Sequence, residues 1–372
     1  MRAVPERTEV ARGVSRLAFD AVEQLSRVVE AMHANIAAAS LPLGRGTDGR
    51  TRGVTGFVYA SIRLVNGAAR TALDSGLSRL PRGAGEAHGP RADALRAALN
   101  GVLGDHLAAT GNPLALPMQL RSEGRALPLE REALAAALPA ASGRLLVLVH
   151  GLCMSDRSFT RRGHDHGAAL ACGGHTPLYL LYNSGRPIAE NGRDLSELLE
   201  ALLAAWPVRV DELVILGHSM GGLVARSACE AAAATERSWL GRLAKLVFLG
   251  TPHHGAPLER AGRWLEGALG LSPYVAPIAR LGALRSAGIG DLARGSSAPL
   301  PAGVACYAVA GTLGPDPLGD GLVPLTSALG QNKDPARALA FPAANRLVAR
   351  GLGHLDLLDD RAVAERLRAW LA

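Results

Sequence analysis

Apolar side chains in the first part of the chain recur every three or four residues, in runs separated by breaks. The first run covers Thr8–Ala38 and the second covers Val54–Leu80, with glycine, arginine and proline frequent between them. A second break at Pro81–Pro90 precedes a third run from Ala92 to Ala108. Because this spacing puts apolar residues on one helical face, the pattern predicts amphipathic helices. We expect them to form a packed bundle or a clamp on the rest of the protein.

The hydrophobic period changes to two between Leu114 and Leu129. Apolar and other residues alternate there on both sides of a turn-like segment at Ser122–Arg125. Such alternation is typical of strands and predicts a hairpin. Pro117 and Pro128 lie within the two runs, and proline cannot donate to a strand ladder, so we expect this hairpin at the edge of a sheet.

Short, uninterrupted apolar runs follow, with helix-compatible stretches between most of them. A short helix is expected at Glu130–Leu138, and the run RLLVLV at Arg144–Val149 suits a strand covered on both faces. Further strands are predicted at Pro177–Tyr182, Glu212–Leu216, Leu243–Leu249, Val304–Ala310 and Arg346–Ala349. Alternating strands and helices indicate an α/β fold, with a doubly wound, mostly parallel sheet. We therefore predict a catalytic domain at residues 112–372 and a helical N-terminal region at residues 1–111.

A buried strand followed by the pattern G-x-S-x-G lies near the middle of this domain. The apolar run Leu213–Leu216 leads into GHSMG at 217–221, and helix-compatible residues come next. A serine at such a strand-to-helix turn has a strained backbone and needs very small neighbours. The first N–H groups of the helix then point at whatever the serine oxygen attacks. The pattern predicts Ser219 as a nucleophile, with an ordinary helix-opening turn as the alternative.

A serine hydroxyl needs a base, and the base needs a carboxylate that holds it in the correct tautomer. His354 follows the last predicted strand on a glycine-flanked loop, and Asp320 lies in a Gly-Asp-Gly loop after the Val304–Ala310 strand. Asp316 lies in the same loop and competes for the role of the acid, but prolines on both sides favour a turn there. We therefore assign the base to His354 and the acid to Asp320.

Five short motifs stand in a characteristic order along residues 112–372. They are LVHGL at 148–152, GHSMGG at 217–222, GTPHHG at 250–255, GDGLVP at 319–324 and GLGHLDLL at 351–358. In this order they resemble the α/β-hydrolase fold family and, within it, bacterial lipases and esterases, including the branch related to GPI inositol-deacylases. The resemblance implies a carboxylic-ester hydrolase that forms an acyl-enzyme.

An oxyanion hole is expected beside the serine, because acyl transfer places negative charge on the former carbonyl oxygen. The first donor should be the Met220 amide at the start of the helix. The resemblance implies the Leu152 amide, directly after His150 and Gly151, as the second donor. The predicted site therefore consists of Ser219, Asp320 and His354 with the amides of Leu152 and Met220.

The other histidines and the cysteines are assigned no catalytic or metal-binding role. We interpret His253 and His254 as structural or pocket-lining, since the family has a similar T-P-H turn, and a catalytic role is the alternative. His150 and His218 are next to the predicted site in sequence and should orient its backbone. The spacing of His164, His166 and His175 is too irregular for a metal site. The four cysteines form no C-x-x-C or Cys/His pattern suited to zinc. We predict neither a metal nor an organic cofactor.

Composition limits the classes of partner. The 372-residue chain is 48% hydrophobic, which supports a large core, and its formal charge is +7. Aromatic residues make up only 4%, and no basic run is interleaved with them, which argues against nucleic-acid binding. Contact with an anionic lipid surface and self-association through the N-terminal helices stay open. The N-terminal residues lack the apolar stretch of a secretory signal, so we expect a cytoplasmic enzyme.

The segment at 255–300 bears on the substrate. Its apolar residues, among them Trp264 and Leu269, have mixed helical spacing and predict a lid that binds acyl chains, with additional core as the alternative. The expected substrate is a small-molecule acyl ester. An acyltransferase or thioesterase would use the same triad, and a non-catalytic protein that binds a lipid or polymer surface is the alternative from another class. The segment YNSGRPIAENGRDL at 182–195 has no function that we can derive from its sequence.

Overall fold

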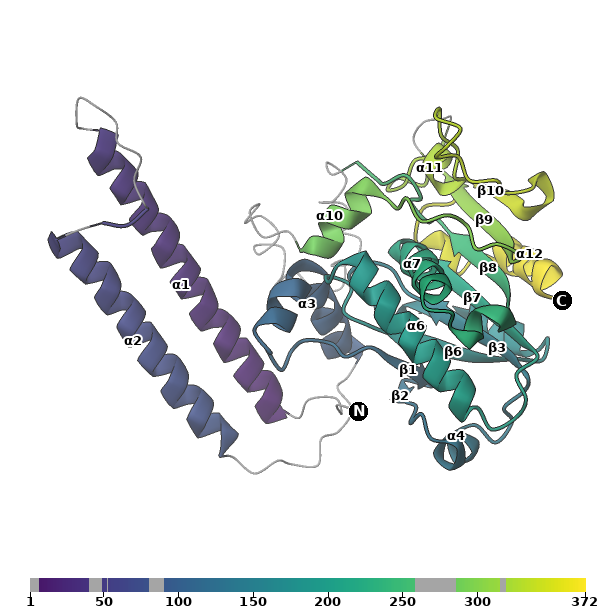
Figure 1. Ribbon diagram of the computed structural model, residues 1–372, viewed down its shortest axis with the longest axis horizontal. Coiled ribbons are helices and arrows are strands. Elements are labelled where there is room, and N and C mark those ends of the chain that lie inside the picture. Colours follow the sequence, from purple (N-terminus) through teal and green to yellow (C-terminus); the bar gives the residue numbers. More distant parts are fainter. Residues whose placement is uncertain (1–6, 40–48, 52, 80–89, 258–285, 315–318) are drawn as a thin grey trace. The chain divides into compact units, whose positions relative to one another are not determined.

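The structure is a computed structural model that describes residues 7–39, 49–51, 53–79, 90–257, 286–314 and 319–372 (Figure 1). Contacts between residues divide the chain into two compact units. The smaller unit comprises 2–87 and 109–114, and the larger unit comprises 88–108 and 115–372.

The smaller unit is a pair of long helices, α1 (Arg7–Ala39) and α2 (Gly53–Ser78). Arginine–carboxylate pairs join them along their length. Asp74 of α2 accepts hydrogen bonds from Arg12 and Arg16 of α1, with N–O distances of 3.2 and 2.7 Å. These contacts hold the pKa of the Asp74 carboxyl well below its usual range. Further pairs are Arg70 with Asp20 and Arg63 with Glu30. The order of these pairs along the two helices shows that α1 and α2 run antiparallel.

Many apolar side chains of these two helices are exposed. Exposed apolar residues are Val14, Val22, Leu25, Val28 and Met32 on α1 and Val58, Ile62, Leu64, Val65 and Leu73 on α2. Polar residues such as Asp20, Ser26 and Glu30 are buried instead. The two helices therefore contact each other largely through polar side chains.

An eight-stranded sheet forms the centre of the larger unit. Its strands are β1 (Gln119–Ser122), β2 (Arg125–Ala126), β3 (Arg144–Val149), β6 (His175–Leu181), β7 (Glu212–His218), β8 (Leu243–Leu249), β9 (Ala305–Thr312) and β10 (Arg346–Arg350), in the spatial order β10-β9-β8-β7-β3-β6-β1-β2. The six strands from β10 to β6 are parallel, whereas β1 pairs antiparallel with both β6 and β2. A separate two-stranded ribbon joins β4 (Thr160–Arg161) to β5 (His164–Asp165).

Helices cover both faces of this sheet (Figure 1). The α-helices described along this part of the chain are α3 (Pro90–Ala109), α4 (Arg131–Ala137), α5 (His166–Ala171), α6 (Ile188–Ala205), α7 (Met220–Ala234), α10 (Ala287–Arg294), α11 (Leu325–Ala328) and α12 (Arg361–Leu371). Successive side chains of a strand point to opposite faces. In β7, Val214 and Leu216 pack in a core cluster that includes residues of α5 and α12. Leu213 and Ile215 are equally buried on the other face, where α7 packs against the sheet and α6 packs against α7.

The predicted fold class is confirmed, because the sheet is mostly parallel, doubly wound and preceded by helices. The hairpin also lies at the edge of the sheet, as its prolines predicted. Its strands are shorter than the hydrophobic alternation suggested, because β1 begins after Pro117 and β2 ends before Pro128. The helix α3, which has the same periodicity as α1 and α2, belongs almost entirely to the unit that contains the sheet.

Most of the predicted lid lies outside the described residues, which exclude 258–285. Its described end forms α10, where the Ser286 hydroxyl accepts a hydrogen bond from the Ile289 amide at 3.4 Å and caps the helix. In the described part of the chain, no helix combines the length and the hydropathy needed to cross a membrane.

Candidate active site

Ser219 occupies a tight turn between β7 and α7. Its φ is 57° and its ψ is −127°, a conformation that costs free energy for any residue with a side chain. The glycines of the motif make the turn sterically feasible. A Cβ atom on Gly217 would lie 2.5 Å from the Gly222 nitrogen, and one on Gly221 would lie 2.1 Å from the Val149 oxygen. The strand-to-helix turn predicted from GHSMG is therefore present.

The Ser219 hydroxyl is buried and has no hydrogen-bond partner within the described residues. Buried polar atoms almost always have a partner, so an exception needs a reason, and a catalytic role is one. The loop after β3 passes directly over the hydroxyl. A Cβ atom built on Gly151 would lie 3.2 Å from Ser219 Oγ, which shows how closely the backbone of that loop approaches the serine.

His354 and Asp320 form a buried pair at the carboxyl end of the sheet. Nδ1 of His354 lies 2.6 Å from Oδ2 of Asp320, and the His354 amide donates to the Asp320 carbonyl oxygen at 3.1 Å. The other carboxylate oxygen of Asp320 accepts from the amides of Leu322 and Val323 at 3.0 and 2.8 Å. Because Nδ1–H donates its hydrogen bond to the carboxylate, the neutral histidine presents Nε2 as its basic atom.

Contacts with neighbouring residues hold His354 beside the turn that carries Ser219. The rings of His218 and His354 have centroids 4.7 Å apart, and Nε2 of His218 lies 3.2 Å from the His354 carbonyl oxygen. Complete burial keeps the pKa of His218 well below its ordinary value, so the neutral ring donates from Nε2. A Cβ on Gly250 would lie 3.1 Å from His354 Nδ1, while Ser219 donates its amide to Leu249 at 2.8 Å. The end of β8 therefore contacts both residues.

The predicted oxyanion donors lie on the two segments that flank the serine. Met220 is the first residue of α7, where the N–H groups of a helix have no partner within the helix. Leu152 is buried in the loop that follows β3. The next residue, Cys153, has a left-handed backbone with φ of 59°, and its amide donates to Ser184 Oγ at 3.0 Å. A side chain from another loop thus fixes the residue that follows Leu152.

The segment whose role the sequence left open holds this loop in place. The Tyr182 hydroxyl donates to the His150 carbonyl oxygen at 2.9 Å, and the two rings stack with centroids 4.4 Å apart. Burial lowers the pKa of His150 to about 4 and raises that of Tyr182 above its usual range, so both side chains stay neutral at pH 7. Together with Ser184, these residues position the backbone on which the second oxyanion donor was predicted.

The helix α3 supports the same loops. A Cβ atom on Gly101 would lie 2.2 Å from Cys153 Sγ, so only a glycine lets the helix approach this closely. One turn further on, the carbonyl oxygen of Gly104 accepts a hydrogen bond from the Asn183 amide group at 2.8 Å. Neither contact was predicted. The glycines at positions 101 and 104 could have indicated a close contact of this helix, because a spacing of three places both on one helical face.

The remaining candidates make other contacts. His253 is fully buried and lies 3.1 Å from the Arg226 guanidinium, and the His254 amide donates to Ser327 Oγ at 3.1 Å. His164 and His166 contact each other, with Nε2 of the former 2.9 Å from Nδ1 of the latter. Among the described residues, no group of three or more His, Cys, Asp or Glu side chains is arranged to hold a metal ion. Asp316, the competing acid, lies outside the described residues.

Sequence comparison matches residues 125–269 to a family described as a domain of unknown function, DUF7379. The matched segment includes Ser219 and the loop after β3. No protein with a curated description matches the chain.

Similar solved structures include lipases and a thioesterase. The mature lipase BlEst2 of Bacillus licheniformis is 17% identical, with 63% of this chain and 93% of that chain covered and a TM-score of 0.45. The RedJ thioesterase from the prodiginine pathway of Streptomyces coelicolor is 16% identical, with 63% and 91% covered and a TM-score of 0.39. The lipase of Staphylococcus hyicus is 13% identical, with 62% and 93% covered and a TM-score of 0.38. Similarity at this level assigns no activity, so the chemistry must be argued from the residues of the site.

Proposed function

We propose that the protein is a serine hydrolase that cleaves carboxylic esters through an acyl-enzyme, with Ser219, His354 and Asp320 as its triad. The observation that carries the proposal is the Ser219 hydroxyl, which is buried without a partner among the described residues on a strained turn. The hydrogen-bonded pair of His354 and Asp320 beside this turn supplies the base and the group that orients it.

In the proposed reaction, Ser219 Oγ attacks the ester carbonyl carbon while His354 Nε2 takes the hydroxyl proton. The carbonyl oxygen becomes negative and accepts hydrogen bonds from the amides of Met220 and Leu152. The C–O bond to the leaving alcohol then breaks, and the alcohol receives the proton from His354. A water molecule, deprotonated by the same histidine, attacks the acyl-enzyme and releases the carboxylic acid and the serine.

Asp320 acts through His354 in this scheme. Its carboxylate accepts a hydrogen bond from Nδ1–H and stabilises the imidazolium that forms during attack. The two amide donors from Leu322 and Val323 keep the carboxylate oriented toward His354.

The finer parts of the proposal rest on the sequence motifs. Their resemblance to bacterial lipases and to the branch related to GPI inositol-deacylases supports an esterase or lipase that acts on a small-molecule acyl ester. A thioesterase or acyltransferase would differ only in the leaving or accepting group. Contact with a lipid surface, self-association through α1 and α2, and a cytoplasmic location stay predictions from the sequence.

The test combines covalent labelling with an activity assay. We expect a fluorophosphonate to label the protein at Ser219 and p-nitrophenyl butyrate to be hydrolysed. Ser219→Ala should lose both, whereas Ser238→Ala, which changes an exposed serine bonded to Glu200, should keep both. Labelling that persists in Ser219→Ala, or wild-type protein that neither reacts with the probe nor hydrolyses any ester of a chain-length series, would refute the proposal.

A further inference from the structure

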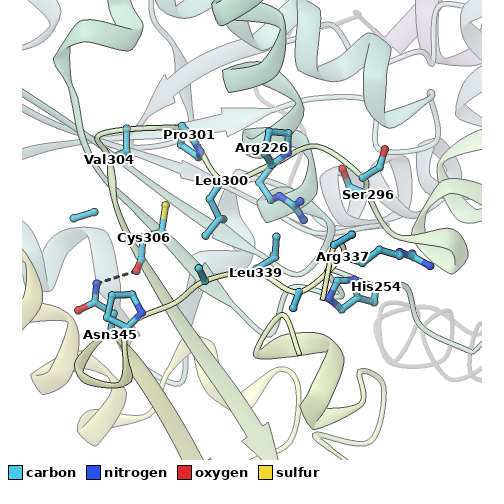
Figure 2. Close-up of a pocket in the computed structure, with 17 residues that line it drawn as sticks. Arg226, His254, Ser296, Leu300, Pro301, Val304, Cys306, Arg337, Leu339 and Asn345 are labelled. Carbon is cyan, nitrogen blue, oxygen red and sulfur yellow. Dashed lines mark hydrogen bonds between the residues drawn. The ribbon is translucent and has the colours of Figure 1, made fainter. Parts of the chain in front are cut away.

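A cavity of about 560 Å³ lies apart from the triad in the larger unit (Figure 2). It is enclosed by the segment that leads into β9, from Ser296 to Cys306, and by the segment that leads into β10, from Ala336 to Asn345. Ser219, Asp320 and His354 do not line it. Its volume is within the range of small-molecule binding sites.

Arg226 of α7 is one of the residues that line this cavity. Its side chain is among the largest that are fully buried, with the residue only 1% exposed. Nη1 lies 3.1 Å from Nδ1 of His253, and Nε has no hydrogen-bond partner among the described residues. Although burial lowers the pKa of Arg226 to about 10, the guanidinium is still charged at pH 7.

Arg226 forms no ion pair with a carboxylate among the described residues, although the charge of Glu230 attracts it through space. His253 is held neutral, because burial keeps its pKa well below the ordinary value, and its ring packs edge-on against Phe248 at 4.6 Å between centroids. Glu230, one turn further along α7, is exposed, and it forms no ion pair with Arg226 within the described chain. A buried cation without an anionic partner is costly, and a bound anion would offset that cost.

The walls of the cavity indicate what kind of anion would fit. Figure 2 shows the Arg226 guanidinium between Leu300 on one side and Ser296, Arg337 and His254 on the other. Apolar side chains line much of the rest, namely Pro299, Leu300, Pro301, Val304, Leu339 and Pro342, with Cys306 and Asn345 at the far side. A guanidinium binds a carboxylate through two parallel hydrogen bonds, and the apolar wall would take a hydrocarbon chain.

We propose that this cavity binds a small amphipathic carboxylic acid, with its carboxylate on Arg226 and its chain against the wall formed by Leu300, Pro301, Val304 and Leu339. The hydroxyl of Ser296 and the guanidinium of Arg337 lie at the same end of the cavity as additional donors. The site is separate from the triad, so it does not depend on the proposed ester hydrolysis.

The experiment is a calorimetric titration of the full chain with octanoate, with octanol and inorganic phosphate as comparison probes. Octanoate should bind, whereas octanol lacks the charge and phosphate lacks the chain, so both should bind at least tenfold more weakly. Arg226→Gln should weaken octanoate binding by about tenfold or more, because a charge-assisted hydrogen bond is lost. Arg209→Gln, at a side chain that is 82% exposed, is the matched control and should bind as the wild type does.

Two variants at the edge of the cavity keep the test decisive if Arg226→Gln does not fold. Leu300→Asp places a negative charge in the apolar wall, and Arg337→Glu reverses an exposed charge at the polar end, so both should weaken octanoate binding. Circular dichroism establishes that each variant is folded. Unchanged octanoate affinity in the folded variants, no octanoate binding by the wild type, or phosphate binding as tight as octanoate binding would overturn the proposal.

Discussion

The backbone amide of Cys153 donates a hydrogen bond to the side-chain oxygen of Ser184 over 3.0 Å, and this bond joins the loop after β3 to the segment that follows β6. Cys153 directly follows Leu152, and its left-handed backbone determines how the loop continues after the predicted oxyanion donor. Ser184 is itself almost fully buried. The hydroxyl of Ser184 is thus well placed to fix the direction of the Leu152 amide.

We expect Ser184→Ala to lower kcat for p-nitrophenyl butyrate by about tenfold, because the buried Cys153 amide would lose a partner worth about 1–3 kcal/mol and the loop would shift. KM should change little, since the oxyanion forms only in the transition state. Ser184→Thr keeps the hydroxyl and should restore most of the rate. A rise in KM with unchanged kcat would instead indicate a role in substrate binding.

The triad variants should lose activity unequally. His354→Ala should cost nearly as much rate as Ser219→Ala, because the two act as a unit, whereas Asp320→Asn should be milder. The measurement is kcat/KM for a soluble ester with each purified variant. Asp316→Asn is the control, and we expect it to resemble the wild type, since the hydrogen bond of His354 is made with Asp320. A greater loss in Asp316→Asn than in Asp320→Asn would move the acid to position 316.

Buried neutral histidines should make the fold sensitive to mild acid. Burial lowers the pKa of His150 to about 4 and keeps those of His218 and His253 well below normal. Their contribution to stability is therefore fully present above the unfolded-state pKa of about 6.5 and is lost as the pH falls toward the folded-state pKa, at about 1.4 kcal/mol per unit of pKa difference. Urea unfolding should show lower stability at about pH 5 than at about pH 7. His150→Gln should reduce this loss of stability between pH 7 and pH 5. If the variant lost as much stability as the wild type, His150 would not contribute to the acid sensitivity.

Two glycines in helix interiors should respond oppositely to alanine. A Cβ on Gly101 of α3 would lie 2.2 Å from Cys153 Sγ, so Gly101→Ala should destabilise the larger unit and lower kcat by displacing the loop. A Cβ on Gly67 of α2 would meet nothing within 4 Å. Gly67→Ala should therefore leave activity unchanged and raise helix stability by about 0.5–1 kcal/mol, because alanine loses less conformational freedom on folding. The measurements are the thermal unfolding temperature and the ester-hydrolysis rate of both variants.

The division of the chain can be tested by truncation. A chain that begins at residue 88 keeps α3 with the sheet, and we expect it to fold and to hydrolyse a small soluble ester. A chain that begins at residue 112 lacks α3, whose glycines contact the loops near the site, and we expect it to be insoluble or much less active. Solubility, circular dichroism and kcat/KM are the measurements. Full activity of the shorter chain would instead support the division at residue 111 that the sequence suggested.

The sheet and the residues proposed for the triad could be predicted because their signals are local. The strand before Ser219, the glycines around it and the helix after it are contiguous, and the strain of the turn restricts which residues can occupy it. Asp320 and His354 were assigned from their loops after successive strands, and parallel strands bring such loops to one edge of the sheet.

The supporting contacts could not be predicted, because they join segments whose local patterns are ordinary. Tyr182 and Ser184 follow a buried strand, and no local pattern indicates that they bond the loop after β3. The periodicity of α3 predicts a helix but not the surface it packs against. Arg226 similarly resembles any basic residue of an amphipathic helix, and only the packing around it reveals a buried charge.

The antiparallel helices α1 and α2 contact each other through arginine–carboxylate pairs while many of their apolar residues are exposed. The attraction between partly exposed charges falls as ionic strength rises, since the screening length shrinks from about 10 Å at 0.1 M salt to about 3 Å at 1 M. Apolar burial responds in the opposite sense to salts that are excluded from protein surfaces. Concentrated sulfate should therefore strengthen the sheet-containing unit while loosening the pair of helices, so the two units of one chain would respond to the same salt in opposite directions.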